Sequence, residues 1–155
     1  MKFKDHVLRL EKMAGGEKQE FLIERWKCQF CPKQKLHRVL PDFLAPNKHY
    51  NTDIIADVLD NNLKTDQEGY EDFEDYPCEK TLERWSAWLT LNLAFINTYL
   101  RSEDVCLSTI GFMLASSTED PVACLRQKEP LLWLRIVLRA IYNTGSSLES
   151  YHDHP

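Results

Sequence analysis

Two runs near the N-terminus alternate apolar and polar residues with the period of a β-strand. They span residues 6–13 and 19–27, and residues 14–17, Ala-Gly-Gly-Glu, separate them. Side chains two residues apart lie on the same face of a strand, and consecutive glycines supply the positive φ angles that a tight turn requires. The pattern therefore predicts an N-terminal β-hairpin.

Helical periodicity begins after the hairpin. Apolar residues recur at helical spacing in residues 52–60, where Asn51 or Thr52 can cap the first turn and Asp53 is favourably placed within it. Residues 79–100 carry a longer amphipathic pattern. We expect one helix over each range.

The rest of the chain predicts further helices. Residues 105–115 are apolar, Pro121 suits a helix start with Asp120 as its cap, and residues 131–142 form a closing amphipathic run. The predicted fold class is α+β, mainly α, with an N-terminal β-hairpin and knuckle followed by a small helical bundle. The predicted parts are a basic hairpin with a Cys-x-x-Cys knuckle (1–50), a short helix and acidic loop (51–76), a helical bundle (77–145) and a flexible tail (146–155).

Charge is unevenly distributed along the 155 residues, whose net charge is −5. Residues 1–50 hold eleven Lys and Arg against six Asp and Glu, whereas residues 51–83 hold two Lys against eleven Asp and Glu. A basic head followed by an acidic middle indicates that only the head faces phosphate. The acidic residues available to a basic partner are Asp66, Glu68, Glu71, Asp72, Glu74 and Asp75.

A Cys-x-x-Cys pair follows the second predicted strand. The two-residue gap between Cys28 and Cys31 lets both thiolates reach one metal ion from a tight turn. His37 is the natural third zinc ligand, with His6 or His49 as the fourth. The chain has no second Cys-x-x-Cys, so zinc binding competes with the alternative of a free cysteine pair that holds no metal.

Basic and aromatic residues alternate around this pair. Lys and Arg neutralise phosphates, and aromatic rings stack on bases or pack against sugars. The alternative is a solvated face on a small hairpin. The predicted nucleic-acid-binding residues are Arg25, Lys27, Lys33, Lys35, Arg38 and Lys48.

The segment after Pro77 is a turn followed by a predicted helix with polar and aromatic residues in its first turns, as in the second helix of a helix-turn-helix. Glu79 and Glu83 would repel phosphate on such a reading face, and an acidic loop far longer than a tight turn separates this helix from residues 52–60. Periodicity favours Trp85 and Trp88 as core residues of the helical bundle.

No motif of an enzyme class is present. The sequence contains no phosphate-binding loop and no Gly-x-Ser-x-Gly, and catalytic carboxylates need the support of rigid elements that residues 61–76 do not predict. We expect a non-enzymatic protein without a small-molecule substrate. No apolar run approaches the roughly 18 residues that span a membrane, and five cysteines without a secretory signal favour the cytoplasm.

Residues 23–31, Ile-Glu-Arg-Trp-Lys-Cys-Gln-Phe-Cys, and residues 36–46, Leu-His-Arg-Val-Leu-Pro-Asp-Phe-Leu-Ala-Pro, resemble an uncharacterised bacterial domain family associated with mobile elements. In that family a zinc-ribbon-like head precedes a transposase-type helix-turn-helix, and the resemblance covers roughly residues 6–90. It implies zinc ligation by Cys28 and Cys31, and DNA binding. The family's first Cys-x-x-Cys is missing, so the chain resembles an N-terminally shortened member.

Two functions follow as hypotheses. The first is a non-enzymatic DNA-binding or regulatory protein of a bacterial mobile element. The second is a protein-binding inhibitor from a phage or mobile element, similar to an anti-CRISPR protein, whose acidic segment occupies the basic groove of a host nucleic-acid-processing protein. Retention on duplex DNA that falls with added salt distinguishes the first hypothesis from the second.

Overall fold

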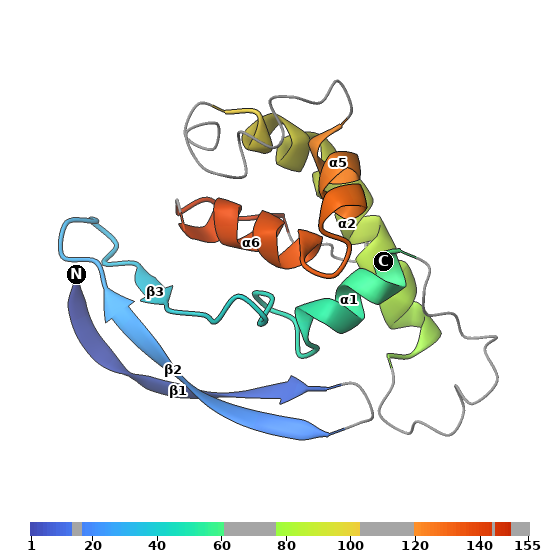
Figure 1. Cartoon of the computed structure of the whole chain (residues 1–155). Helices are drawn as coiled ribbons and strands as arrows, with labels where there is room; N and C mark the ends of the chain where they lie inside the picture. Colours follow the sequence, from blue (N-terminus) through green and yellow to red (C-terminus); the bar gives the residue numbers. More distant parts are fainter. Residues whose placement is uncertain (14–16, 61–76, 103–119, 144, 150–155) are drawn as a thin grey trace.

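The computed structural model describes residues 1–13, 17–60, 77–102, 120–143 and 145–149. Within these residues a three-stranded antiparallel sheet is followed by helices that pack together (Figure 1). The predicted α+β class is confirmed. The predicted acidic loop from residue 61 to 76 and the predicted helix over residues 105–115 lie outside the described residues.

The sheet consists of a long hairpin and one short strand. Strands β1 (Lys2–Lys12) and β2 (Lys18–Lys27) pair antiparallel, and β3 (Leu36–Arg38) pairs with the end of β2. The predicted hairpin is confirmed, but β1 begins earlier than its alternation indicates. An irregularity in the pairing between Phe3 and Asp5 interrupts the alternation there.

The two faces of the hairpin differ in exposure. Val7 and Ile23 are paired across the strands on the inner face, and Ile23 is only 2% exposed. Leu8 and Leu22 are paired on the outer face, where they are 56% and 71% exposed. The inner face therefore carries the apolar residues that attach the sheet to the rest of the molecule.

Residues 39–50 connect the sheet to the helices and contact both. The ring of Phe43 lies 5.2 Å from that of Phe21 on β2, between centroids. At the other end of the segment, the ring of Tyr50 lies 5.3 Å from that of Trp85 in a T-shaped contact. The hairpin thus packs on this connecting segment, and the segment packs on the helical core.

The described helices are α1 (Thr52–Leu59), α2 (Glu79–Leu100), α5 (Pro121–Lys128) and α6 (Trp133–Asn143). Helices α1, α2 and α5 begin where the sequence predicts, whereas α6 begins two residues after the predicted start at residue 131. Asn51 caps α1, because its Oδ1 accepts a hydrogen bond of 2.8 Å from the backbone N–H of Asp53. Asp120 precedes α5 without a side-chain capping bond. None of the described helices combines the length and the apolar character needed to cross a membrane.

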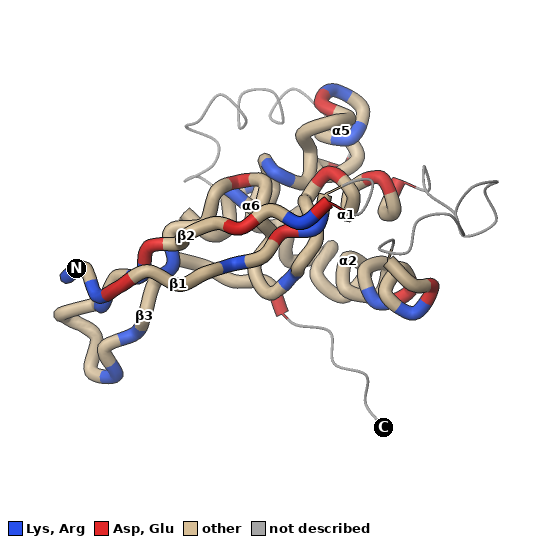
Figure 2. The backbone as a smooth tube through the Cα atoms, turned by 90° about the horizontal axis from the view of Figure 1, so that it is seen from below, with Lys and Arg blue, Asp and Glu red and all other residues tan. Residues whose placement is uncertain are grey.

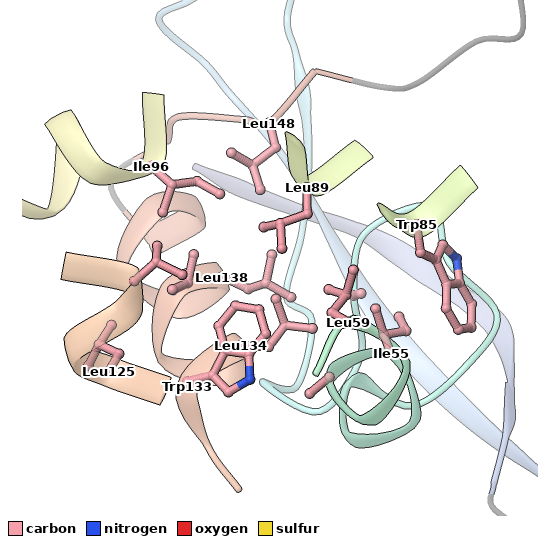
Figure 3. Packing of buried hydrophobic residues seen from close by; sticks show 14 of the residues in the cluster. Ile55, Leu59, Trp85, Leu89, Ile96, Leu125, Trp133, Leu134, Leu138 and Leu148 are labelled. Carbon is pink, nitrogen blue, oxygen red and sulfur yellow. The ribbon is translucent and has the colours of Figure 1, made fainter. Parts of the chain in front are cut away.

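The helices share one hydrophobic core (Figure 3). Trp85 and Trp88 on α2 are 3% and 5% exposed, which confirms the prediction that they are core residues. Trp133 on α6 is fully buried, and its Nε1–H donates a hydrogen bond of 2.8 Å to Oδ2 of Asp60. The bundle is therefore held together largely by the burial of tryptophan side chains, and the polar atom of Trp133 has a partner.

Residues 146–149, which the sequence analysis assigns to a flexible tail, are anchored to the bundle. Leu148 is 8% exposed and belongs to the hydrophobic core (Figure 3). The Asn92 side chain accepts a hydrogen bond of 2.8 Å from the backbone N–H of Glu149 and donates one of 3.1 Å to its carbonyl. The burial of Leu148 and the two bonds of Asn92 anchor this segment, and neither feature leaves a periodic pattern in the sequence.

Candidate nucleic-acid interface

The Cys-x-x-Cys knuckle is a closed turn between β2 and β3. The backbone N–H of Cys28 donates to the carbonyl of Lys35 at 2.9 Å, and that of Gln34 donates to the carbonyl of Cys31 at 2.8 Å. Gln34 has a φ of 45°, a left-handed conformation that the tight turn requires. The backbone N–H of Cys31 also donates to Cys28 Sγ at 3.2 Å, so the turn brings the two thiols together.

The two thiols influence each other's acidity. A hydrogen bond from Cys31 lowers the pKa of Cys28, and the same bond raises the pKa of Cys31. His37, the predicted third zinc ligand, lies on β3 opposite Trp26. The described residues contain no group of three or more His, Cys, Asp and Glu side chains able to hold a metal ion. Zinc binding stays a prediction that rests on the cysteine pair, because the described residues supply fewer ligands than the four a structural zinc site needs.

Two of the six predicted nucleic-acid-binding residues make internal contacts. Arg25 donates from Nε and Nη2 to the carboxylate of Asp5, at 2.6 and 2.5 Å. This paired bond lowers the pKa of Asp5 and raises that of Arg25. Lys48 places its Nζ 4.9 Å from the ring centroid of Trp88, and burial lowers the pKa of its ammonium group. Both residues therefore help to hold the fold together.

The other four predicted residues lie together at one end of the sheet. Figure 2 shows Lys and Arg positions beside the N-terminus and along the loop into β3. All four are exposed, and none forms an ion pair with another described residue. These residues are Lys27, Lys33, Lys35 and Arg38.

Lys2 extends this group, and the sequence analysis did not single it out. In the β1–β2 register Lys2 is directly opposite Lys27. Like charges directly opposite on neighbouring strands destabilise a sheet unless an anion offsets them. The signal was available in the sequence, since a hairpin centred on residues 14–17 brings position 2 close to position 27. We call Lys2, Lys27, Lys33, Lys35 and Arg38 the basic tip.

Nearby carboxylates are already engaged. Asp5 binds Arg25, and Glu24 Oε2 accepts a hydrogen bond of 2.9 Å from Trp26 Nε1. The Trp26 ring also packs edge-on against Phe3, with centroids 5.6 Å apart. Positive charge at the basic tip is therefore left without an internal counter-ion among the described residues.

Phe30 is the aromatic residue of the knuckle that is left free to meet a ligand. It lies between the two cysteines and is 90% exposed. Tyr50, the more distant aromatic residue of the predicted interface, packs against Trp85. The predicted acidic partner-binding residues, from Asp66 to Asp75, lie outside the described residues.

Comparison with known proteins places the chain in a family. Residues 1–85 match the family model described as Domain of unknown function (DUF6431). The chain belongs to DUF6431. The matched DUF6431 region contains the whole sheet, the connecting segment, α1 and the start of α2, and so includes the complete basic tip. No curated protein and no solved structure matches the chain.

The predicted membership of an uncharacterised domain family is confirmed by this match. Its extent, residues 1–85, is close to the range of roughly 6–90 over which the resemblance was recognised. The association with mobile elements and the zinc-ribbon-like head are finer predictions that the DUF6431 description does not address.

Proposed function

We propose that this DUF6431 protein is a non-enzymatic DNA-binding or regulatory protein of a bacterial mobile element, and that the basic tip contacts the phosphate backbone. The observation that supports this most strongly is the cluster of exposed cations at the tip, none of which has an ion-pair partner among the described residues. Each Lys or Arg that neutralises a phosphate releases condensed counter-ions, so such a cluster favours binding.

The shape of the tip suits contact with a nucleic acid. Lys33 and Lys35 project from a loop closed by backbone hydrogen bonds, and Lys27 and Arg38 flank that loop on two paired strands. A rigid loop loses less conformational entropy on binding than a mobile one does. Phe30, at 90% exposure, adds a ring able to stack on an unpaired base or pack against a sugar.

Salt dependence of DNA affinity tests this proposal. Fluorescence anisotropy with a duplex oligonucleotide, measured from low to moderate salt, yields the slope of log K against log salt. Lys33→Gln combined with Lys35→Gln reduces the magnitude of that slope by about 2, because each lost phosphate contact removes about 0.9. The expected affinity loss is largest at low salt.

The matched control removes the same charge elsewhere. Lys80 and Arg139 are exposed on α2 and α6 and belong to neither the knuckle nor the sheet, so Lys80→Gln combined with Arg139→Gln is expected to leave the slope unchanged. Equal losses in both double variants would mean that the binding is only non-specific attraction to net charge. No binding by the native chain at low salt would contradict the proposal and favour the inhibitor hypothesis.

We also propose zinc binding by Cys28 and Cys31, in keeping with the resemblance to a zinc-ribbon-like head. The turn that brings the two thiols together supports this part of the proposal. Purified protein is expected to contain stoichiometric zinc that is lost in Cys28→Ser and retained in Cys78→Ser, which alters an exposed cysteine outside the knuckle. A zinc content below one per chain that does not change in Cys28→Ser would contradict zinc binding by the cysteine pair.

A further inference from the structure

A pocket lies under the inner face of the hairpin. It has a volume of about 560 Å³ and is bounded by β1, β2 and the segment that follows β3. Apolar side chains form much of its wall, among them Val7, Ile23 and Leu40. Ligand pockets usually measure about 300–1,000 Å³ and combine apolar walls with a few polar groups, so this pocket has the size and lining of a small-molecule site.

The polar groups of the pocket are positive or neutral. Arg9 and Arg38 contribute two guanidinium groups, and Asn47 and His49 complete the polar lining. None of the described residues that line the pocket is Asp or Glu. Burial lowers the pKa of Arg9, and repulsion by the charge of Arg38 lowers it further, whereas the carboxylate of Glu11 opposes both effects.

The Arg9 side chain is held in place but incompletely bonded. Its Nη2 donates to the backbone carbonyls of Ala45, at 2.5 Å, and of Lys48. Its Nε is buried without a hydrogen-bond partner among the described residues. Arg38 is exposed at the rim and has no carboxylate partner among the described residues.

We infer that this pocket binds a small organic anion, with an apolar or aromatic body against Val7, Ile23 and Leu40 and a carboxylate, sulfonate or phosphate group between Arg9 and Arg38. The anionic group is attracted to both guanidinium groups and offsets the repulsion between them. The site is distinct from the proposed phosphate contacts of the knuckle, although Arg38 borders both.

Two fluorescent probes with the same aromatic body test the inference. Anilinonaphthalene sulfonate carries a negative charge, whereas N-phenylnaphthylamine has none. The native chain is expected to bind the sulfonate saturably at one site, and about tenfold or more tightly than the neutral probe, as a charge-assisted hydrogen bond would provide. Arg38→Gln should remove the preference for the sulfonate over the neutral probe. Leu40→Ala should weaken the binding of both probes.

Two controls separate this site from other surfaces. Arg139→Gln removes a cation from an exposed position of α6 and should leave both affinities unchanged. Leu22→Ser alters the exposed outer face of the hairpin, where Leu22 is 71% exposed, and should also have no effect. Circular dichroism and urea unfolding verify that each variant folds.

Three results would overturn the inference. They are equal affinity of the native chain for the two probes, sulfonate binding that is unchanged in Arg38→Gln, and sulfonate binding that is lost in Leu22→Ser. Because this readout contains no nucleic acid, failure here is distinguishable from failure of DNA binding.

Discussion

Glu11 is a carboxylic acid buried where the hairpin meets the helices. Its side chain is 1% exposed, and Oε1 has no hydrogen-bond partner among the described residues. Burial raises its pKa above the ordinary value of 4.5, and the Asn51 side chain and the charge of Arg135 oppose that rise in part. The folded chain therefore holds this proton more tightly than the unfolded chain does.

This raised pKa predicts a stability that depends on pH. The contribution of protonated Glu11 is complete below the unfolded pKa and falls as the pH rises toward the folded pKa. Glu11→Gln keeps the shape without the ionisation, so it should raise the free energy of unfolding at pH 7 by about 1 kcal/mol and change little at pH 4. Urea unfolding at the two pH values measures the difference.

A control for Glu11 removes a carboxylate from the exposed face of the hairpin. Glu20→Gln on β2 should leave the pH dependence of the native chain intact. If Glu11→Gln instead destabilised the chain more at pH 7 than at pH 4, attraction of the ionised carboxylate to Arg135 would outweigh the cost of its burial.

At the scale of elements, the side-chain amide of Asn92 bonds α2 to the segment 145–149. Asn92 is 2% exposed, and besides its two bonds to Glu149 it donates to the carbonyl of Trp88 at 2.8 Å. Its removal takes away the partners of the N–H and the carbonyl of Glu149 in two partly buried bonds, which costs about 1–3 kcal/mol. The segment also carries Leu148 into the core, so its docking and the packing of the bundle are coupled.

Asn92→Ala is therefore expected to lower the free energy of unfolding by about 2 kcal/mol. It should also speed limited proteolysis near the C-terminus, because Glu149 loses its anchor. Thr98→Ala on the same helix removes an exposed hydroxyl that bonds to the carbonyl of Ala94, and it should change stability by less than about 0.5 kcal/mol. Equal effects of the two substitutions, with unchanged proteolysis, would show that the amide does not hold the segment.

At the scale of the whole molecule, local patterns predict elements well and distant contacts poorly. The hairpin, the Asn51 cap and the start of α2 follow from alternation, capping chemistry and helical spacing. Arg25 and Lys48 look like phosphate ligands because charge is a local property, but their partners, Asp5 and Trp88, are far away in the sequence. The same limit applies to residues 146–149: the sequence predicts a flexible tail there, because the partners of Leu148 and Glu149 lie far away in the chain.

Of the two candidate sites, only the one built from residues close together in the sequence could be predicted. The cations of the knuckle were predictable, since they lie within a few residues of each other. The pocket was not, because Arg9, Arg38 and Asn47 come from three stretches of the chain that meet only after the hairpin packs on the connecting segment. The pattern of residues along β1 does not show that Arg38, from another strand, will lie at the same pocket as Arg9.

The attachment of the hairpin has a mechanical consequence. Lys12, at the end of β1 farthest from the basic tip, is bonded to the connecting segment through the His49 carbonyl and the Asn51 N–H. The eleven residues of β1 extend for about 35 Å from that base, at about 3.3 Å per residue. Arg9 and Phe21 attach the middle of the hairpin to the same segment, so the hairpin is held at more than its base. The sheet therefore sets how far the basic tip stands from the helices, and the proposed phosphate contacts would inherit that fixed distance.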